Sequence, residues 1–119
     1  MINIRKLIHS YLKTIHPRVY FLKAPAKTTF PYIVYSFNVS DTGEWYKLIT
    51  LDIDGWDNKD DTTQLETLME QVNTLNKKVL SNDSMSMTFF LDRQIPLTDE
   101  ENDISRHKYI YQARLIERG

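Results

Sequence analysis

The chain has 119 residues, of which 41% are hydrophobic and 26% charged, and its formal net charge is −1. This composition is typical of one globular domain over residues 1–119, large enough to bury a normal core. The near-neutral charge provides no overall basic field for DNA or anionic lipid, and the lack of cysteine excludes disulfides, thiol catalysis and cysteine-ligated zinc. The first sixteen residues, MINIRKLIHSYLKTIH, are too polar for a signal peptide or membrane span, so we expect no membrane partner.

The N-terminal segment predicts a helix followed by a short strand. Apolar residues recur at three- and four-residue steps between Ile4 and Ile15, which is the stripe of an amphipathic helix over residues 2–15. Pro17 ends this helix, because the residue before a proline is driven out of the helical region. The β-forming residues near 18–22 then predict the first strand.

Two longer strands are predicted next. After a polar loop over residues 23–30, the second strand covers residues 31–40, and its apolar residues alternate: Ile33, Tyr35, Phe37 and Val39. A turn at Asp41-Thr42-Gly43 leads to a third strand over residues 45–56. Because a short turn joins these two strands, we expect them to be antiparallel.

The second half of the chain predicts a long helix and two more strands. The helix begins near Thr63, where Thr63 and Glu66 have the spacing of a capping box, and its apolar stripe extends to about Leu80. A fourth strand is expected over residues 85–91 and a fifth over 106–117, separated by an acidic loop over 92–105.

The element order is therefore α-β-β-β-α-β-β, which predicts a two-layer α+β domain. We expect a mostly antiparallel sheet of four to five strands with two helices on one face. The other face should be polar if it meets only water, but several of its residues are large and apolar. Such a patch on a globular domain favours an interface, so we predict that this face contacts a partner. The interface candidates are Tyr32, Val34, Leu48, Trp56, Phe90, Ile110 and Ile116.

Groups that could carry chemistry are sparse. Asp52 and Asp54 lie two residues apart on one strand, as magnesium ligands could, but alternating aspartates are more often a solvated or interface face. The basic run Arg106-His107-Lys108 lies beside tyrosines, which is more typical of a strand edge than of a nucleic-acid site. We therefore predict no catalytic residue, no metal, no cofactor, no sequence-specific nucleic-acid binding and no enzymatic activity.

A second charged cluster lies in the expected loop between the last two strands. It contains Asp99, Glu100, Glu101 and Asp103. Alone it indicates a solvated loop. In a ring through which DNA passes, carboxylates that line the channel would keep a polyanion from sticking by like-charge repulsion, so this segment is a candidate channel-lining loop.

Four segments carry a resemblance to a known family. They are RVY at residues 18–20, FPYIVYS at 30–36, LDIDGWD at 51–57 and KYIYQARLIE at 108–117. In this order, around a first and a long second helix, they resemble the tail-completion or tail-terminator proteins of long-tailed phages and prophages. Pro31, Tyr32 and Trp56 match that pattern, and their plain role is in the fold.

The resemblance implies a structural virion protein, made in the bacterial cytoplasm, that acts in head–tail joining. Several members of that family assemble as a six-membered ring that caps the tail tube and docks it to the head, and DNA crosses that ring during ejection. The implied partners are thus copies of the chain itself, the tail tube protein and head connector proteins. A chain that forms a ring in the particle could still be a monomer in solution. The alternatives are another neck or connector protein of the same particle, and a small α+β binding module.

Overall fold

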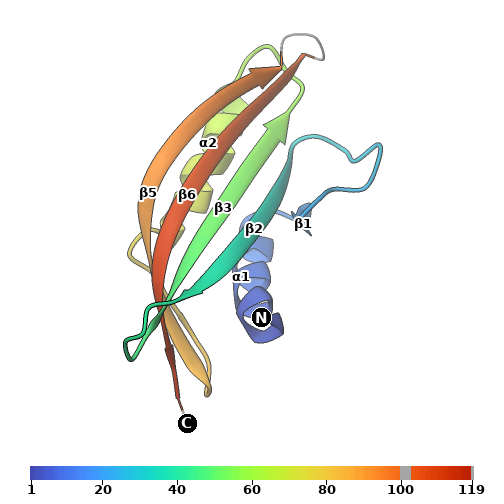
Figure 1. The fold of residues 1–119 in the computed structure, drawn as a ribbon. Helices are drawn as coiled ribbons and strands as arrows, with labels where there is room; N and C mark the ends of the chain where they lie inside the picture. The colour runs from blue at the N-terminus through green and yellow to red at the C-terminus, as the bar shows by residue number, and fades with distance from the viewer. Residues whose placement is uncertain (100–102, 119) are drawn as a thin grey trace.

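The structure, a computed structural model, describes residues 1–99 and 103–118 and contains two helices and one six-stranded sheet. Both helices lie against the same face of the sheet, whose four central strands are long and twisted (Figure 1). The elements are α1 (Ile2–Ile15), β1 (Val19–Phe21), β2 (Tyr32–Asp41), β3 (Lys47–Asp57), α2 (Thr63–Val72), the 3-10 turn η1 (Asn73–Leu75), β4 (Val79–Ser81), β5 (Met85–Asp99) and β6 (Ile104–Glu117).

The predicted α+β class is confirmed, with two differences in the sheet. Its strand order is β1-β2-β3-β6-β5-β4, so it has six strands where four to five were expected. The pair β1–β2 is parallel and every other neighbouring pair is antiparallel. The sheet is therefore mixed, although antiparallel pairing dominates it as predicted.

The second helix is shorter than its apolar stripe indicated. It ends at Val72, and the chain passes through η1 and a left-handed residue, Lys77 with φ 66°, before β4 begins. Val79, expected on the buried stripe, is exposed in β4. Pairing with β5 decides this local structure, because the Lys77 N–H donates to the Phe89 carbonyl at 2.7 Å. The prediction of a helix to about Leu80 was wrong.

The segment expected as an acidic loop is mostly strand. β5 continues to Asp99 and β6 begins at Ile104, so the two strands form a long hairpin. A bulge makes this possible: Leu91 pairs with Tyr111 and Arg93 with Ile110, which leaves Asp92 without a partner across the strand. One extra residue reverses the inward and outward alternation, so the two-residue period on which the prediction rested is interrupted there.

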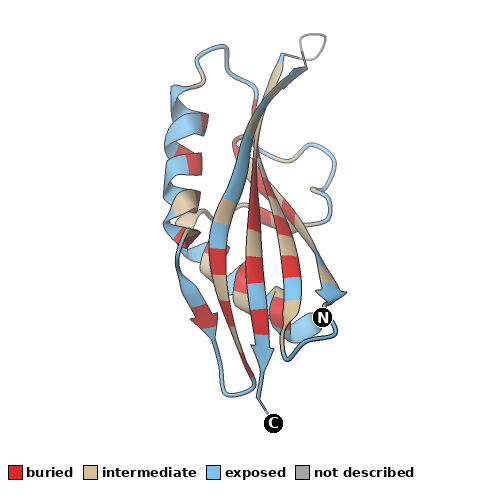
Figure 2. Ribbon diagram, turned by 60° about the vertical axis from the view of Figure 1, so that its left-hand side comes forward, coloured by how far each residue is buried: buried red, intermediate tan, exposed pale blue. Residues whose placement is uncertain are grey.

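The core lies between the two helices and the covered face of the sheet, where buried positions alternate along the strands (Figure 2). α2 packs very closely on β3 at Gly55. A Cβ built there would come within 2.6 Å of Met69 Sδ and 2.9 Å of Leu65 Cδ1. The absence of a side chain at Gly55 thus permits this close approach, which sets the height of α2 above the sheet.

Candidate functional site

The face of the sheet opposite the helices forms the candidate site. The registers of β2, β3 and β6 bring their even-numbered residues together on this open face. It divides into two regions along the strands. We call the region lined by Trp45, Leu48, Phe90 and Ile116 the apolar groove, and the region formed by Asp52, Asp54, Trp56, Arg106 and Lys108 the ionic cluster.

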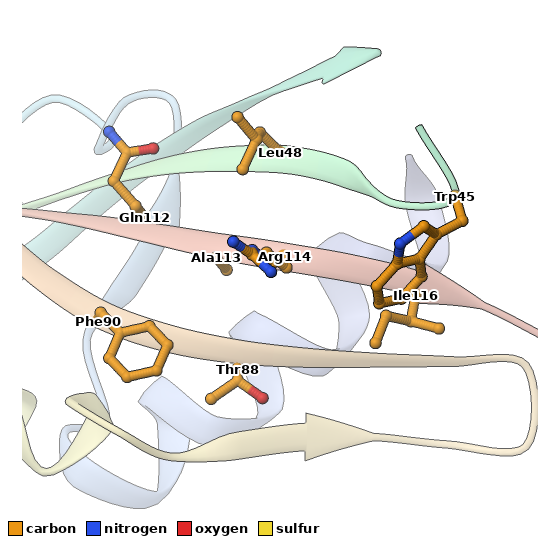
Figure 3. A pocket seen from close by; sticks show the side chains of 8 residues that line it. All are labelled: Trp45, Leu48, Thr88, Phe90, Gln112, Ala113, Arg114 and Ile116. Atoms are coloured by element: carbon orange, nitrogen blue, oxygen red, sulfur yellow. The ribbon is translucent and has the colours of Figure 1, made fainter. Parts of the chain in front are cut away.

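The apolar groove is a shallow hollow of about 580 Å³ near the end of the sheet that carries the β2–β3 turn. Large apolar side chains from three strands and that turn surround it, as Figure 3 shows. Trp45 is 69% exposed and Phe90 is 52% exposed. Arg114, on the central strand β6, also lines the groove, and its guanidinium lies 4.7 Å from the centre of the Tyr46 ring. This combination of exposed aromatic and arginine side chains is typical of protein interfaces.

The ionic cluster occupies the other half of the same face. Arg106 Nη2 lies 3.2 Å from Asp54 Oδ2. Lys108 Nζ lies 3.6 Å from Asp52 and 3.9 Å from Asp54. The two acids come from β3 and the two bases from β6, at positions that the antiparallel register places opposite or diagonal to one another.

An aromatic stack extends the ionic cluster toward β2. The Arg106 guanidinium lies 4.3 Å from the centre of the Trp56 ring, and the opposing ring of Tyr32 stacks on Trp56 at 6.0 Å with an interplanar angle of 11°. Phe30 and Tyr20 pack on Tyr32 in turn, at centroid distances of 5.2 and 6.2 Å. Aromatic and cation–π contacts of this kind hold the side chains in fixed positions on a face without covering helices.

Partial burial has the largest effect on the pKa of Asp54 in this cluster. Burial raises the pKa of Asp54 above its ordinary value, although the charges of Arg106 and Lys108 act in the opposite direction. Three buried polar atoms of the cluster make no hydrogen bond within the described part of the chain: Asp54 Oδ1, Trp56 Nε1 and Arg106 Nε. Since buried polar atoms are normally satisfied, this end of the face has unused hydrogen-bonding capacity.

The predicted interface residues all lie on the open face, but their exposure differs. Leu48, Phe90 and Ile116 are exposed and line the apolar groove, whereas Tyr32, Val34 and Trp56 are partly buried. Ile110 is only 6% exposed, between the register neighbours Asp52 and Arg93, so it offers a partner almost no surface. That these residues form an interface stays a prediction.

The predicted charged sites are placed differently from one another. Arg106 and Lys108 are occupied by ion pairs with Asp52 and Asp54, while His107 lies near Tyr109 and α2 on the covered side. The basic run is thus divided between the two faces of the sheet. Because the acids and bases neutralise each other, neither set is left as a separate charged site.

The acidic segment is described only at its two ends. Asp99 is the last residue of β5, and Asp103 is exposed just before β6 with φ 52°. Glu100 and Glu101 lie outside the described residues.

Sequence reasoning missed two parts of this face. Trp45 was placed in a strand, but it belongs to the exposed turn before β3, and Arg114 was not considered. The ion pairs had a usable signal: acids alternate at Asp52 and Asp54 on one strand, and bases alternate at Arg106 and Lys108 on another. Reading the two patterns together would have predicted that β3 and β6 are neighbours.

The described residues form neither a metal site nor a helix that could cross a membrane. Among residues 1–99 and 103–118, no group of three or more His, Asp or Glu side chains is arranged to hold a metal ion. Within the same residues, neither helix has the length and apolar composition needed to cross a membrane.

Comparison with known proteins gives a match of fold. No profile of a known protein family matches the chain, and no curated protein sequence matches it. Among solved structures, the fold is similar to that of a chain in the virion of a native gene transfer agent particle, with a TM-score of 0.71 and 14% identity. The similarity covers 97% of this chain and 92% of the other. The two proteins therefore share nearly their whole fold.

Proposed function

We propose that this chain is a structural virion protein of a phage or prophage, and that it forms a ring at the head–tail junction. In this role it completes the tail tube as a tail terminator and joins the tube to the head, without catalytic activity. The observation that carries the proposal is the similarity of fold, over nearly the full length of both chains, to a component of a gene transfer agent virion.

The open face supports a role in assembly. It carries an apolar groove of about 580 Å³ beside a fixed ionic cluster, where a face that met only water would be polar. Apolar patches rimmed by charged groups are typical of protein contacts. The partners that we propose for the chain are further copies of itself, the tail tube protein and the head connector proteins.

The acidic segment between β5 and β6 receives a separate role in this proposal. If DNA crosses the ring, the acidic segment from Asp99 to Asp103 is our candidate for the channel lining. Its carboxylates would repel the phosphate backbone and let the DNA slide. The chain would then need no nucleic-acid site of its own.

Electron microscopy of the parent particle tests the proposal. We expect lysates of a strain in which this gene is deleted to contain DNA-filled heads and separate tails. Addition of the purified protein should restore joined particles. Normal joined particles in the deletion strain would remove the proposed role at the junction.

Two other functions make different predictions. Another neck or connector protein of the same particle would differ in its copy number and in the side of the junction where it is found. A small binding module is favoured by one observation, the hollow shape of the apolar groove. It would be supported if a small ligand raised the melting temperature of the isolated protein, since ligands stabilise the state that they bind.

A further inference from the structure

Two long strands of the sheet are each left unpaired along half of one edge. β1 pairs with β2 only from Ile33 to Tyr35, because Leu22 adopts a left-handed φ of 71° and turns the chain away. The edge of β2 from residue 36 to residue 41 therefore has no partner strand within the described chain.

The second free edge belongs to β5. β4 pairs with β5 only as far as Thr88, and the Asn76 side chain then accepts the Leu91 N–H at 2.9 Å. From the bulge to the end of the strand, residues 94–99, no strand of the described chain pairs with this edge. Exposed backbone edges of this length are ready templates for another strand.

The two free half-edges lie at opposite corners of the sheet. Leu97 on β5 is level with Tyr32 on β2, through the pairs Leu97–Arg106, Arg106–Trp56 and Trp56–Tyr32. The free half of β5 is thus level with the N-terminal half of β2, on the opposite edge of the sheet, whereas the free half of β2 lies at the other end of the strands, as can be followed in Figure 1. One molecule cannot use both edges on itself, but two molecules shifted along the strand direction can.

Backbone alternation identifies the groups that each edge offers. On β2, backbone groups of Ile33 and Tyr35 form hydrogen bonds with the chain on the β1 side. Because the direction of these groups alternates along a strand, the odd-numbered residues Phe37, Val39 and Asp41 also direct their N–H and C=O groups toward the free edge. On β5, before the bulge, the backbone groups of Phe89 and the N–H of Leu91 form hydrogen bonds on the side away from β6. The bulge shifts this pattern by one residue, so the outward groups of the free half belong to Gln94, Pro96 and Thr98.

We propose that neighbouring copies of this chain join edge to edge, with the free half of β5 in one copy pairing antiparallel with the free half of β2 in the next. The inference rests on the proposed ring and identifies the surface through which its copies meet. Full overlap of the two half-edges fixes the register, in which Phe37 faces Thr98, Val39 faces Pro96 and Asp41 faces Gln94. Every outward backbone group except the Val39 carbonyl then finds a partner, because Pro96 has no N–H.

The side chains are compatible with this register. Phe37 and Val39 lie on the helix side of β2, and Gln94 and Pro96 lie on the helix side of β5, so the helices of both copies cover the same face. On the open side, Asn38 would face Leu97 and Ser40 would face Ile95. No pair of like charges is opposed, and the open face of each copy remains available for a different component of the particle.

The shift between copies suits a closed ring. Within one copy, Leu97 is level with Tyr32 of the same chain. In the proposed contact, Leu97 instead faces Asn38 of the neighbouring copy, which is six residues farther along β2. At ~3.3 Å per residue this is a shift of about 20 Å, over four strands that together span about 19 Å. The strands would then tilt by about 45° to the ring axis, close to the 35–45° at which sheets close on themselves.

Pro96 also explains why such a contact would be weak in isolation. A proline on a free edge lowers the tendency of that edge to pair nonspecifically. One junction between two copies is therefore a small contact with an incomplete ladder. A closed ring joins every copy at two junctions, so the assembled ring is stabilised where a pair of copies is not.

Disulfide trapping tests the pairing in a chain whose lack of cysteine gives a clean background. The double variant N38C/L97C places two cysteines in a non-hydrogen-bonded pair, where α-carbons are about 4.5 Å apart and a disulfide can form. The matched control N38C/R93C has the same number of cysteines on the same edges, but its second cysteine is about 13 Å out of register. Each is oxidised both as purified protein at high concentration and in particles, then analysed on non-reducing gels.

We expect a ladder of covalent oligomers, ending at the closed ring, for N38C/L97C and only monomer for N38C/R93C. Monomer for both variants in both preparations, or equal ladders for both, would overturn edge pairing. As a second test, Val39→Pro removes an outward N–H without removing a bond to β3, so it should leave the melting temperature nearly unchanged and abolish the oligomers. Oligomers that persist in Val39→Pro would also contradict the pairing.

These outcomes are separable from those of the proposed function. A ladder together with normal particles in the gene-deletion strain would keep the pairing and remove the role at the junction. Separated heads and tails in the deletion strain, with no ladder from particles that contain N38C/L97C, would keep the role and remove the pairing.

Discussion

The two faces of the sheet are built in different ways. The covered face alternates large apolar side chains that are wholly buried against α1 and α2, and at Gly55 the helix and the strand approach closely. The open face has a groove with exposed apolar side chains in one half and partly buried ion pairs in the other. The comparison indicates that the covered face supplies most of the stability of the fold, while the open face is free to serve binding.

Neighbouring phenylalanines give the largest test of this difference. Phe89 is wholly buried and Phe90 is 52% exposed, and they point to opposite faces of β5. Phe89→Ala should reduce the free energy of unfolding by about 3–5 kcal/mol, because it removes buried area and leaves a cavity. Phe90→Ala should change it by less than about 0.5 kcal/mol and act on particle assembly instead. Urea unfolding monitored by circular dichroism measures both, and equal losses would mean that the faces do not differ in this way.

Gly55→Ala tests the close packing of α2 on β3. The added methyl group would overlap Met69 Sδ and Leu65 Cδ1, so we expect a loss of about 1–3 kcal/mol in the free energy of unfolding. The control is Gly43→Ala, where nothing lies within 4 Å of the new methyl group but φ is +75°. It should cost about 1–2 kcal/mol from backbone strain alone. A smaller loss at Gly55 than at Gly43 would show that α2 can move away easily.

Trp56 tests whether the aromatic stack on the open face serves the fold or a partner. Trp56→Ala removes the stacking on Tyr32 and Arg106, which is worth about 0.5–1.5 kcal/mol beyond burial of area. Trp56→Phe keeps one aromatic ring for stacking and loses the second ring of the indole together with Nε1, which has no partner in the described chain. We expect Trp56→Ala to fold and to fail in head–tail joining, and Trp56→Phe to retain both properties. Normal joining by Trp56→Ala would exclude this end of the face as the contact.

The smallest expected effect is a pH dependence at Asp54. Because burial raises the pKa of Asp54 above 3.8, the folded state binds the proton more tightly than the unfolded state. The stability that this contributes is present below the unfolded pKa and is lost as pH rises through the raised folded value. The difference in unfolding free energy between the native chain and Asp54→Asn should therefore fall as pH is raised through that window. A difference that increases with pH would mean that the ion pairs outweigh burial.

The sequence predicted the parts of the fold that depend on local periodicity. The helix over 2–15 and the two strands after it were found because proline, a turn glycine and alternating apolar residues define them locally. The end of the second helix and the extension of β5 were missed. The end of the second helix depends on pairing with β5, and the extension of β5 depends on the bulge at Asp92, which interrupts the two-residue period.

The candidate site shows the same limit. Alternation placed every predicted interface residue on the correct face, because a strand has a strict two-residue period. It did not reveal that neighbours cover Ile110, or that the acids of β3 meet the bases of β6, since both depend on the order of strands in the sheet. A charge at Ile110 would therefore perturb the fold and is unsuitable as a probe of the interface.

The bulge in β5 has a consequence for how the gene can vary. Asp92 is the one residue by which β5 is longer than its pairing with β6 requires at that point. Replacing it with another polar residue should be nearly neutral, because its side chain is exposed. Deleting its codon would leave the pairs Leu91–Tyr111 and Arg93–Ile110 next to each other in a regular ladder, so Ile95 and Leu97 would stay on the open face and Gln94 on the helix side. The pairing of β5 with β6 therefore tolerates a change of chain length at Asp92 as well as a change of residue, and what the extra residue contributes is a local bend and twist of β5.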